Sequence, residues 1–292
     1  MDNTINIKTV RKADKEYPEK LLHIEDAPEI LYFIGTLPDP NKKSVSIVGS
    51  RNASSYGLTL AKTLSKILSE NDVQIISGLA LGIDSEAHIG AIDANKPTYA
   101  LMGCGVNICY PTYNANIYNK IIKCGGGIIS DYEINTPPLP HNFPFRNRLI
   151  AGLSDVVIVV EGKNNSGSLI TAEYALKQGK DIFACPGRIG DSLSEGTNNL
   201  IKQGAYILTS ADDVLSYLGL FIDGILPKKS VDINSLDYYE KIIYDTLDKN
   251  TYHIDEISNM SHLPIDKCIN ILMSLQLKGL ITSTISNYYK II

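Results

Sequence analysis

The residues best suited to chemistry in this sequence are arginines, serines and glycines gathered in short loops. Arg51 follows the apolar run Val45–Val48 and stands between Ser50 and Ser54, just before a helical pattern. Backbone N–H groups and hydroxyls at the start of a helix bind phosphate, and a guanidinium adds two parallel hydrogen bonds. We therefore expect this loop to bind an anion. The plainer alternative is that its serines only cap the helix and that Arg51 is solvated.

A second loop of this kind follows the next apolar run, with the sequence SGLALGID at 77–84. Gly78 and Gly82 are expected to allow a ligand to approach the backbone closely. Asp84 suits a helix cap as well as a ligand contact, and it lies one turn before His88, within reach of a hydrogen bond. A single helical histidine is more often structural than catalytic, so we expect no catalytic role for His88.

The third segment places two arginines and two phenylalanines at the start of a helical pattern, in NFPFRNRLIAGL. Arg146 and Arg148 flank Asn147, and arginine forks match phosphate oxygens while aromatic faces stack on unpaired bases. Residues two apart on a helix do not point at the same spot. We favour Phe143 and Phe145 as core anchors and expect at least one of the arginines to face the ligand.

Two further loops continue the pattern toward the C-terminus. Ser166, Gly167, Ser168 and Thr171 open a helix after another apolar run, and they offer hydroxyls and free amides to an oxyanion. Arg188 follows a Pro-Gly turn and supplies one more cation. We expect all these residues to contribute to one binding surface.

The elements that position these loops are short strands alternating with helices. The strands are expected at Val45–Val48, Val73–Ile76, Thr98–Met102, Gly127–Ser130, Val156–Val160, Ile182–Ala184 and Tyr206–Leu208. The helices are expected near 56–70, 83–93, 113–123, 144–153, 168–179, 196–203 and 211–218. Strands that are apolar throughout are buried on both faces, which is typical of a mostly parallel, doubly wound α/β sheet of the Rossmann-like kind. The loops at the carboxyl ends of such strands share one edge, so they should form one cleft suited to a polyanion.

Composition divides the chain into four parts. Residues 1–43 are a lead-in, 44–222 the Rossmann-like domain, 223–235 a linker rich in proline, glycine and polar residues, and 236–292 a small C-terminal unit. Three helical patterns followed by two β-like runs predict a winged helix for that unit. Its seven acidic residues outnumber its five lysines, so we favour an interaction or regulatory role over DNA binding.

Charge and composition narrow the function classes. The net charge of −5 requires any nucleic-acid site to be a local positive pocket. No apolar stretch is long enough for a membrane span, and the N-terminus has no apolar segment typical of a signal peptide, so a cytoplasmic protein is expected. The cysteines predict free thiols, mostly buried, and no metal site, because they are odd in number, scattered and never spaced as CxxC: Cys104, Cys109, Cys124, Cys185 and Cys268.

Motifs of the common catalytic and cofactor sites are missing. The sequence contains no GxGxxG fingerprint after the first strand, no Walker loop and no GxSxG elbow, so we expect no cofactor and no enzyme activity. One alternative is a nucleotide N-glycosidase of the lysine-decarboxylase-like (LOG) group, but the PGGxGTxxE loop of that group is split here between Pro186-Gly187 and Glu195-Gly196-Thr197. A nucleotide-sensing module is a further alternative.

Together the loops resemble the DNA-processing A (DprA/Smf) family. The matching runs fall in order over residues 17–214: GSRNASSYG, SGLALGID with AH, GCGVNICYP, FPFRNRLIAGLS, NNSGSLITAEYA, PGR and EGTNNLIKQGA. The resemblance implies a Rossmann-like fold, a homodimer, binding of single-stranded DNA without sequence specificity, and loading of the RecA recombinase onto that DNA. In competent bacteria, such proteins protect DNA taken up in natural transformation, with no known catalytic step.

Residue by residue, the resemblance implies that the family's DNA pocket contains Arg51, Arg146 and Arg148, lined by the SGS loop at 166–168. This sequence also departs from the family pattern. Leu81 stands where the family usually has a basic residue, which removes one expected phosphate contact. The C-terminal unit resembles the winged-helix domain at the end of many relatives.

Overall fold

The computed structural model describes residues 6–220, 236–247, 251–277, 280–283 and 288–291. Internal contacts group the chain into two compact units, Met1–Phe221 and Ile222–Ile292. The predicted linker at 223–235 lies outside the described residues.

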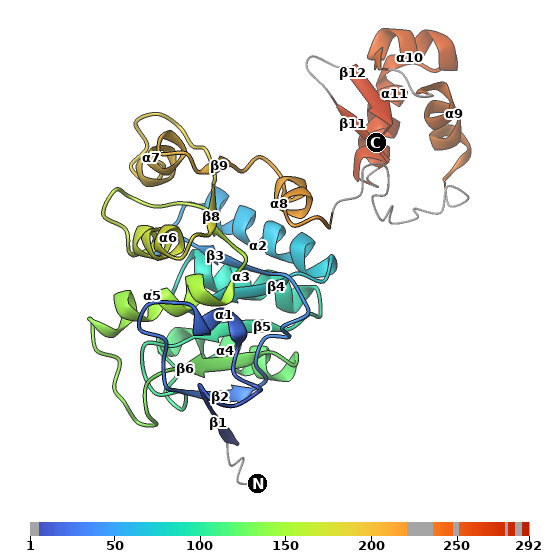
Figure 1. Cartoon of the computed structure of the whole chain (residues 1–292). Coiled ribbons are helices and arrows are strands. Elements are labelled where there is room, and N and C mark those ends of the chain that lie inside the picture. Colours follow the sequence, from blue (N-terminus) through green and yellow to red (C-terminus); the bar gives the residue numbers. More distant parts are fainter. Residues whose placement is uncertain (1–5, 221–235, 248–250, 278–279, 284–287, 292) are drawn as a thin grey trace. The chain divides into compact units, whose positions relative to one another are not determined.

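The first unit is built around one sheet, which has nine strands within the described residues and the order β1-β2-β6-β5-β4-β3-β7-β8-β9 (Figure 1). Neighbouring strands from β6 to β9 in that order run parallel. The strands are β1 (Ile7–Arg11), β2 (Ile30–Gly35), β3 (Ser44–Val48), β4 (Gln74–Ser77), β5 (Thr98–Leu101), β6 (Gly127–Ser130), β7 (Val156–Val159), β8 (Asp181–Ala184) and β9 (Tyr206–Ile207). The chain builds outward from β3 to β6 and then returns to the other side of β3 with β7.

Helices cover both faces of the sheet (Figure 1). Successive strand residues point to opposite faces, so Ile47 packs on one side and Val48 on the other, and both are buried. The helices α1 (Glu19–Leu22), α5 (Asn142–Leu153), α6 (Gly167–Lys177) and α7 (Glu195–Lys202) supply buried side chains to one face. The other face is covered by α2 (Ser55–Glu70), α3 (Ile83–Asp93), α4 (Ala115–Lys123) and α8 (Ala211–Tyr217). The predicted doubly wound α/β architecture is confirmed.

The lead-in belongs to the same sheet. Strand β2 pairs antiparallel with β6, and β1 pairs antiparallel with β2, so the segment expected to precede the domain extends its edge. Helix α1 packs against α5, and Leu21, Leu149 and Leu153 belong to the same buried core. The apolar run at 30–35 pairs with a strand almost a hundred residues later in the chain, and local sequence cannot indicate that partner.

At the C-terminal end of helix α5, the last carbonyl oxygens have no hydrogen-bond donors within the helix, and a lysine side chain supplies them. Lys180 Nζ donates to the carbonyl oxygens of Ala151, at 2.7 Å, and of Ser154, at 2.6 Å. A cation at the C-terminal end of a helix also matches the negative end of the helix dipole. This contact fixes the helix that carries Arg146 and Arg148.

The second unit contains α9 (Tyr238–Leu247), β10 (Tyr252–His253), α10 (Ile254–Ser261), α11 (Ile265–Leu277), β11 (Ile281–Ser283) and β12 (Tyr288–Ile291). Strand β12 pairs antiparallel with both β10 and β11. Ile243, Ile257 and Leu272, one from each helix, are fully buried in a core of their own. The predicted winged helix, three helices with a terminal hairpin, is confirmed and gains the short strand β10.

Two expectations from composition concern the thiols and the membrane. All five cysteines are free; Cys104, Cys185 and Cys268 are buried, whereas Cys109 and Cys124 are half-buried. Within the described residues, no helix has the length and apolar character needed to cross a lipid bilayer.

Candidate nucleic-acid interface

A cavity of about 390 Å³ opens at the carboxyl edge of the sheet, between the loops that follow β3 and β7. We call it the switch-point cavity, because β3 and β7 are neighbours from which the chain winds in opposite directions. In open α/β sheets, ligands bind at this point. Its walls come from four segments: the Arg51 loop, Ala80 and Asp84 around the start of α3, the first turns of α5 and the first turn of α6.

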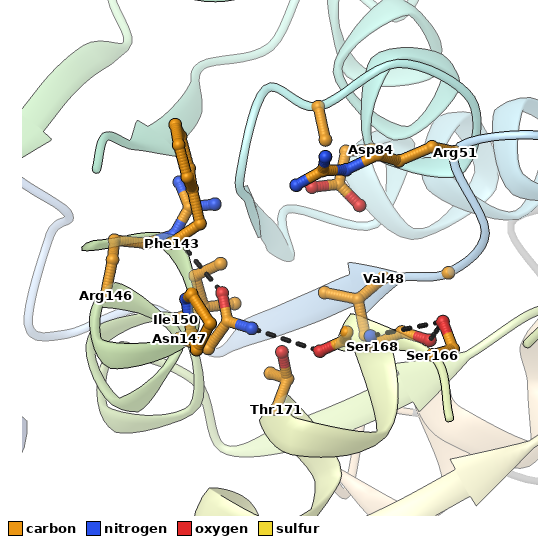
Figure 2. Close-up of a pocket in the computed structure, with 14 residues that line it drawn as sticks. Val48, Arg51, Asp84, Phe143, Arg146, Asn147, Ile150, Ser166, Ser168 and Thr171 are labelled. Atoms are coloured by element: carbon orange, nitrogen blue, oxygen red, sulfur yellow. Dashed lines mark hydrogen bonds between the residues drawn. The ribbon is translucent and has the colours of Figure 1, made fainter. Parts of the chain in front are cut away.

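Arg51 extends into this cavity from the loop between β3 and α2 (Figure 2). Among the described residues, no carboxylate lies within ion-pair distance of its guanidinium, which is solvent-exposed. Buried Glu161, at the end of β7, holds the loop, because its carboxylate accepts a hydrogen bond from the Ser54 amide at 2.8 Å and its carbonyl accepts one from the Ser50 amide at 2.8 Å. The loop is therefore fixed while its arginine remains available.

Phe143 stands on the opposite wall, in the first turn of α5 (Figure 2). Its ring centroid lies 5.9 Å from Cζ of Arg51 and 6.0 Å from Cζ of Arg146. The ring is half-buried. A half-open aromatic face beside an exposed guanidinium is the pairing that binds an unpaired base together with its phosphate.

Arg146 forms the floor of the cavity and is almost fully buried. Its Nη1 donates to the carbonyl oxygen of Gly78 at 3.0 Å and to that of Leu101, and its Nε donates to the Asn147 side chain at 3.3 Å. Burial lowers the pKa of Arg146 to about 10, although Asp84 opposes this shift. These partners orient the guanidinium but are neutral, so its charge contributes to the cavity.

Asp84 is the carboxylate on the cavity wall, and burial raises its pKa while the charge of Arg146 lowers it. Its Oδ2 accepts a hydrogen bond from the Gly78 amide at 3.1 Å. Asp84 is not the helix cap, because the cap position of α3 is Gly82, and it forms no hydrogen bond with His88. His88 Nδ1 lies 2.8 Å from Thr98 Oγ1.

Helix α6 contributes hydroxyl groups to the third wall. Ser166 is its cap, and the Ser166 and Ser168 hydroxyls lie 2.8 Å apart (Figure 2). Asn147 Nδ2 crosses from α5 and donates to the Gly167 carbonyl at 3.1 Å, which ties the two helices together. With Thr171, this set lines the cavity as the sequence predicted.

The remaining predicted residues of the first loops lie beside the cavity. Ser50 lines an adjacent cavity that shares Arg51, and Gly78 lines a small one next to Phe143. Gly82, at φ +78°, is needed for close packing within the protein, since a Cβ there would lie 2.3 Å from the Ser50 carbonyl oxygen. Its role is to seat the Arg51 loop, and not to admit a ligand.

Ser54 and Arg188 line a different cavity, of about 660 Å³, near Cys185. The Ser54 hydroxyl is engaged in capping, because it accepts the Gly57 amide at 3.0 Å and donates to Glu161. The carboxylates of Glu161 and Asp191 share this second cavity with Arg188. These two residues are therefore not brought together with Arg146 and the α6 hydroxyls.

The prediction that both arginines of α5 line one pocket is corrected by the structure. Arg148 points to the other side of the helix, where its Nη2 lies 2.6 Å from Asp131 and its Nε donates to the Asp26 carbonyl at 3.2 Å. Its guanidinium also stacks 3.8 Å from the ring centroid of Phe145. Arg148 is buried and neutralised by Asp131, so it positions the helix and does not contact a ligand in this cavity.

The interpretation of Phe143 and Phe145 as core anchors is also wrong. Phe145 is 40% exposed, and Phe143 faces the cavity. Sequence reasoning also missed Glu161 as the residue that holds the Arg51 loop. A signal was available: Glu161 is the first polar residue after the apolar run of β7, at the predicted binding edge.

Protein-family models and known relatives agree with this architecture. The model described as DNA recombination-mediator protein A matches residues 8–219, and the DprA winged helix domain model matches residues 227–284. Protein Smf of Escherichia coli is 35% identical over 286 residues, which is 96% of this chain and 76% of the relative. DNA processing protein DprA of Streptococcus pneumoniae is 43% identical over 207 residues, which is 70% of this chain and 71% of the relative.

Solved structures give the same result. The X-ray structure of DprA from Streptococcus pneumoniae matches with a TM-score of 0.68 at 40% identity, over 72% of this chain and 74% of that one. A structure of DNA processing protein A from Helicobacter pylori, described for its single-stranded DNA binding mode, matches with a TM-score of 0.65 at 31% identity, over 75% of this chain and 98% of that one. The chain therefore belongs to the DNA-processing A (DprA/Smf) family.

Proposed function

We propose that this protein binds single-stranded DNA in the switch-point cavity. The observation that carries the proposal is the placement of the exposed Arg51 guanidinium and the half-buried Phe143 ring on opposite walls of one cavity. Arg51 binds a phosphate and Phe143 stacks on the base. The single-stranded DNA binding described for the Helicobacter pylori relative supports the same ligand.

Single strands are favoured over duplex because of the aromatic wall. In a duplex the bases stay paired and stacked, so a ring set inside a cavity of about 390 Å³ does not reach a base face. Sequence preference is expected to be weak, because guanidinium, hydroxyl and amide contacts to the backbone do not read base edges. Affinity should fall steeply with salt, since phosphate contacts release counterions.

The test is a binding titration of the full chain with fluorescently labelled dT20 and with a duplex of the same length, at several salt concentrations. The proposal predicts tighter binding of the single strand and a linear fall of log affinity with log salt. Equal affinity for both probes, or no salt dependence, would contradict it.

We further propose the finer role that the family resemblance implies. The bound protein protects incoming single-stranded DNA in the cytoplasm of a competent cell, acts as a homodimer and helps to load RecA. Equilibrium sedimentation tests the dimer. A RecA-filament assay on strands already covered by single-strand-binding protein tests loading, and wild type that does not speed filament formation would contradict that role.

We also propose that the protein is not an enzyme and works without a cofactor. Within the described residues, no group of three or more His, Cys, Asp or Glu side chains has the geometry of a metal site. The N-glycosidase alternative predicts that the protein releases free base from nucleoside monophosphates. An assay for that release decides between the two, provided that any activity found is checked for loss in Arg51→Ala.

A further inference from the structure

We infer that the bound strand continues from the switch-point cavity into an adjacent one, where Lys163 binds the next phosphate. The inference rests on the proposed function, since it extends the path of the same strand. The second cavity, which we call the Lys163 cavity, has a volume of about 460 Å³ and is lined by Ser50, Arg51, Asn52, Lys163, Asn165 and Ser192, among others.

The two cavities are joined at Arg51 and Ser166, which line both of them. An arginine between two hollows is placed to contact the phosphate that links the nucleotides on its two sides. Because successive phosphates follow one another along a continuous backbone, a strand held at Arg51 must leave the first cavity by some route. The Lys163 cavity opens such a route at the same edge of the sheet.

The chemistry of the Lys163 cavity matches a phosphodiester. Its lining contains two cations and no carboxylate, together with the hydroxyls of Ser50 and Ser192 and the amides of Asn52 and Asn165. Among the described residues, no acidic group forms an ion pair with Lys163, and its side chain is exposed. An unpaired lysine among neutral donors binds a phosphate without first breaking a salt bridge.

The acidic groups nearest this cavity do not line it and are engaged in hydrogen bonds. Glu195 accepts a hydrogen bond from Asn164 Nδ2 at 3.2 Å, and Asp191 Oδ1 accepts the Leu193 amide at 3.0 Å. Asp191 lines the cavity around Arg188 together with Glu161, and that cavity is a mixed-charge environment. The charge distribution therefore favours the Lys163 cavity as the continuation of the site.

Three variants that each lower the net charge by one test the inference with labelled dT20. Lys163→Ala removes the cation, and Ser192→Asp places a carboxylate in the same cavity. Lys123→Ala is the matched control, because Lys123 is exposed in the last turn of α4, at the opposite edge of the sheet. We expect the first two to weaken binding by about 5- to 10-fold, the lower end of the loss for one charge-assisted contact because Lys163 is exposed, and the control by less than about twofold.

Two further readouts separate a second phosphate contact from a general loss of charge. Lys163→Ala should reduce the slope of log affinity against log salt by about one. In the double variant with Arg51→Ala, binding should be weaker than in either single variant, because each residue contacts a different phosphate; the two effects need not add in full, since both residues line this cavity.

The outcomes are distinct. If Arg51→Ala weakens binding but Lys163→Ala and Ser192→Asp bind like wild type, the inference is wrong and the proposed function stands. If Lys123→Ala weakens binding as much as Lys163→Ala, the effect is long-range charge and the inference also fails. If wild type itself does not bind dT20, the proposed function is what fails.

Discussion

Helix α5 separates two regions of this protein that use arginine in opposite ways. On one side, Arg146 is buried beneath the switch-point cavity with hydrogen bonds to neutral groups. On the other side, Arg148 is equally buried but paired with Asp131 at 2.6 Å. Within the described part of the chain, Arg146 has no carboxylate within ion-pair distance, although Asp84 acts on it from the same cavity, whereas the charge of Arg148 is cancelled by a direct ion pair. Burial alone therefore does not reveal the role of an arginine, whereas the charge of its partners does.

The most severe test of this comparison is Arg148→Ala. Removing the cation leaves the Asp131 carboxylate buried without its partner, which should reduce the free energy of unfolding by about 3–5 kcal/mol. Urea denaturation measures the loss. The double variant Arg148→Met/Asp131→Leu removes both charges and should recover much of it. If Arg148→Ala is as stable as wild type, the ion pair between Arg148 and Asp131 does not stabilise the fold.

Arg51→Ala tests the switch-point cavity, where the substitution should reduce DNA affinity and not protein stability. The exposed Arg51 side chain has no ion-pair partner among the described residues, so its loss should change the melting temperature little. Affinity for dT20 should fall by about 1–3 kcal/mol, as for a lost charge-assisted contact. Arg51→Lys keeps the positive charge but loses the bidentate guanidinium, so its affinity for dT20 should lie between those of wild type and Arg51→Ala. If Arg51→Ala loses stability, and its loss of DNA binding is explained by unfolding alone, then Arg51 has a structural role like that of Arg148.

The third prediction concerns His88, which is buried near Arg146, and the dependence of protein stability on pH. Burial, with a smaller effect of Arg146, lowers the pKa of His88 to about 3, so the folded state holds this histidine neutral while the unfolded state binds a proton near pH 6.5. Stability is therefore lost as pH falls below 6.5, by up to about 2 kcal/mol at pH 5. His88→Gln should show a smaller drop between pH 7 and pH 5 in urea denaturation. An identical drop in both proteins would contradict the assignment.

The smallest expected effect is a gain of affinity at Leu81. This side chain is 41% exposed and lines a small cavity with Arg51 and Phe143, at the position where the family resemblance leads us to expect a basic residue. Leu81→Arg should add one phosphate contact and tighten dT20 binding by about 3- to 5-fold, somewhat under 1 kcal/mol. Leu81→Gln is the control for polarity without charge. If both variants bind like wild type, the strand does not pass this side of the cavity.

Much of the fold could be predicted because its signals are local. The apolar runs of the parallel strands and the glycine and serine loops after them lie close in sequence, and helix α3 begins and ends at the predicted residues, Ile83 and Asp93. The antiparallel strands β1 and β2 could not be predicted, because their place depends on pairing with β6. No local feature of residues 30–35 indicates that partner.

The site could be predicted as an edge of the sheet, but not residue by residue. Arg51 and the α6 hydroxyls were found because their position after a strand determines where they lie. Helix geometry indicates that Arg146 and Arg148 face different ways, but which of them faces the cavity depends on tertiary partners such as Asp131, which the motif does not contain. The motif does not distinguish the two arginines, whereas in the structure Arg146 lines the cavity and Arg148 packs on the other side of the helix.

The hydrogen bonds that hold the Arg51 loop in place have a consequence for the rate at which DNA binds. Glu161 fixes the Ser50 and Ser54 amides, and Gly82 packs directly beneath the Ser50 carbonyl, so the loop is already ordered before a ligand arrives. A pre-ordered site loses little conformational entropy on binding. Encounter with a strand should then be limited by diffusion and electrostatic steering and not by a slow loop rearrangement, so the association rate should fall as salt is added.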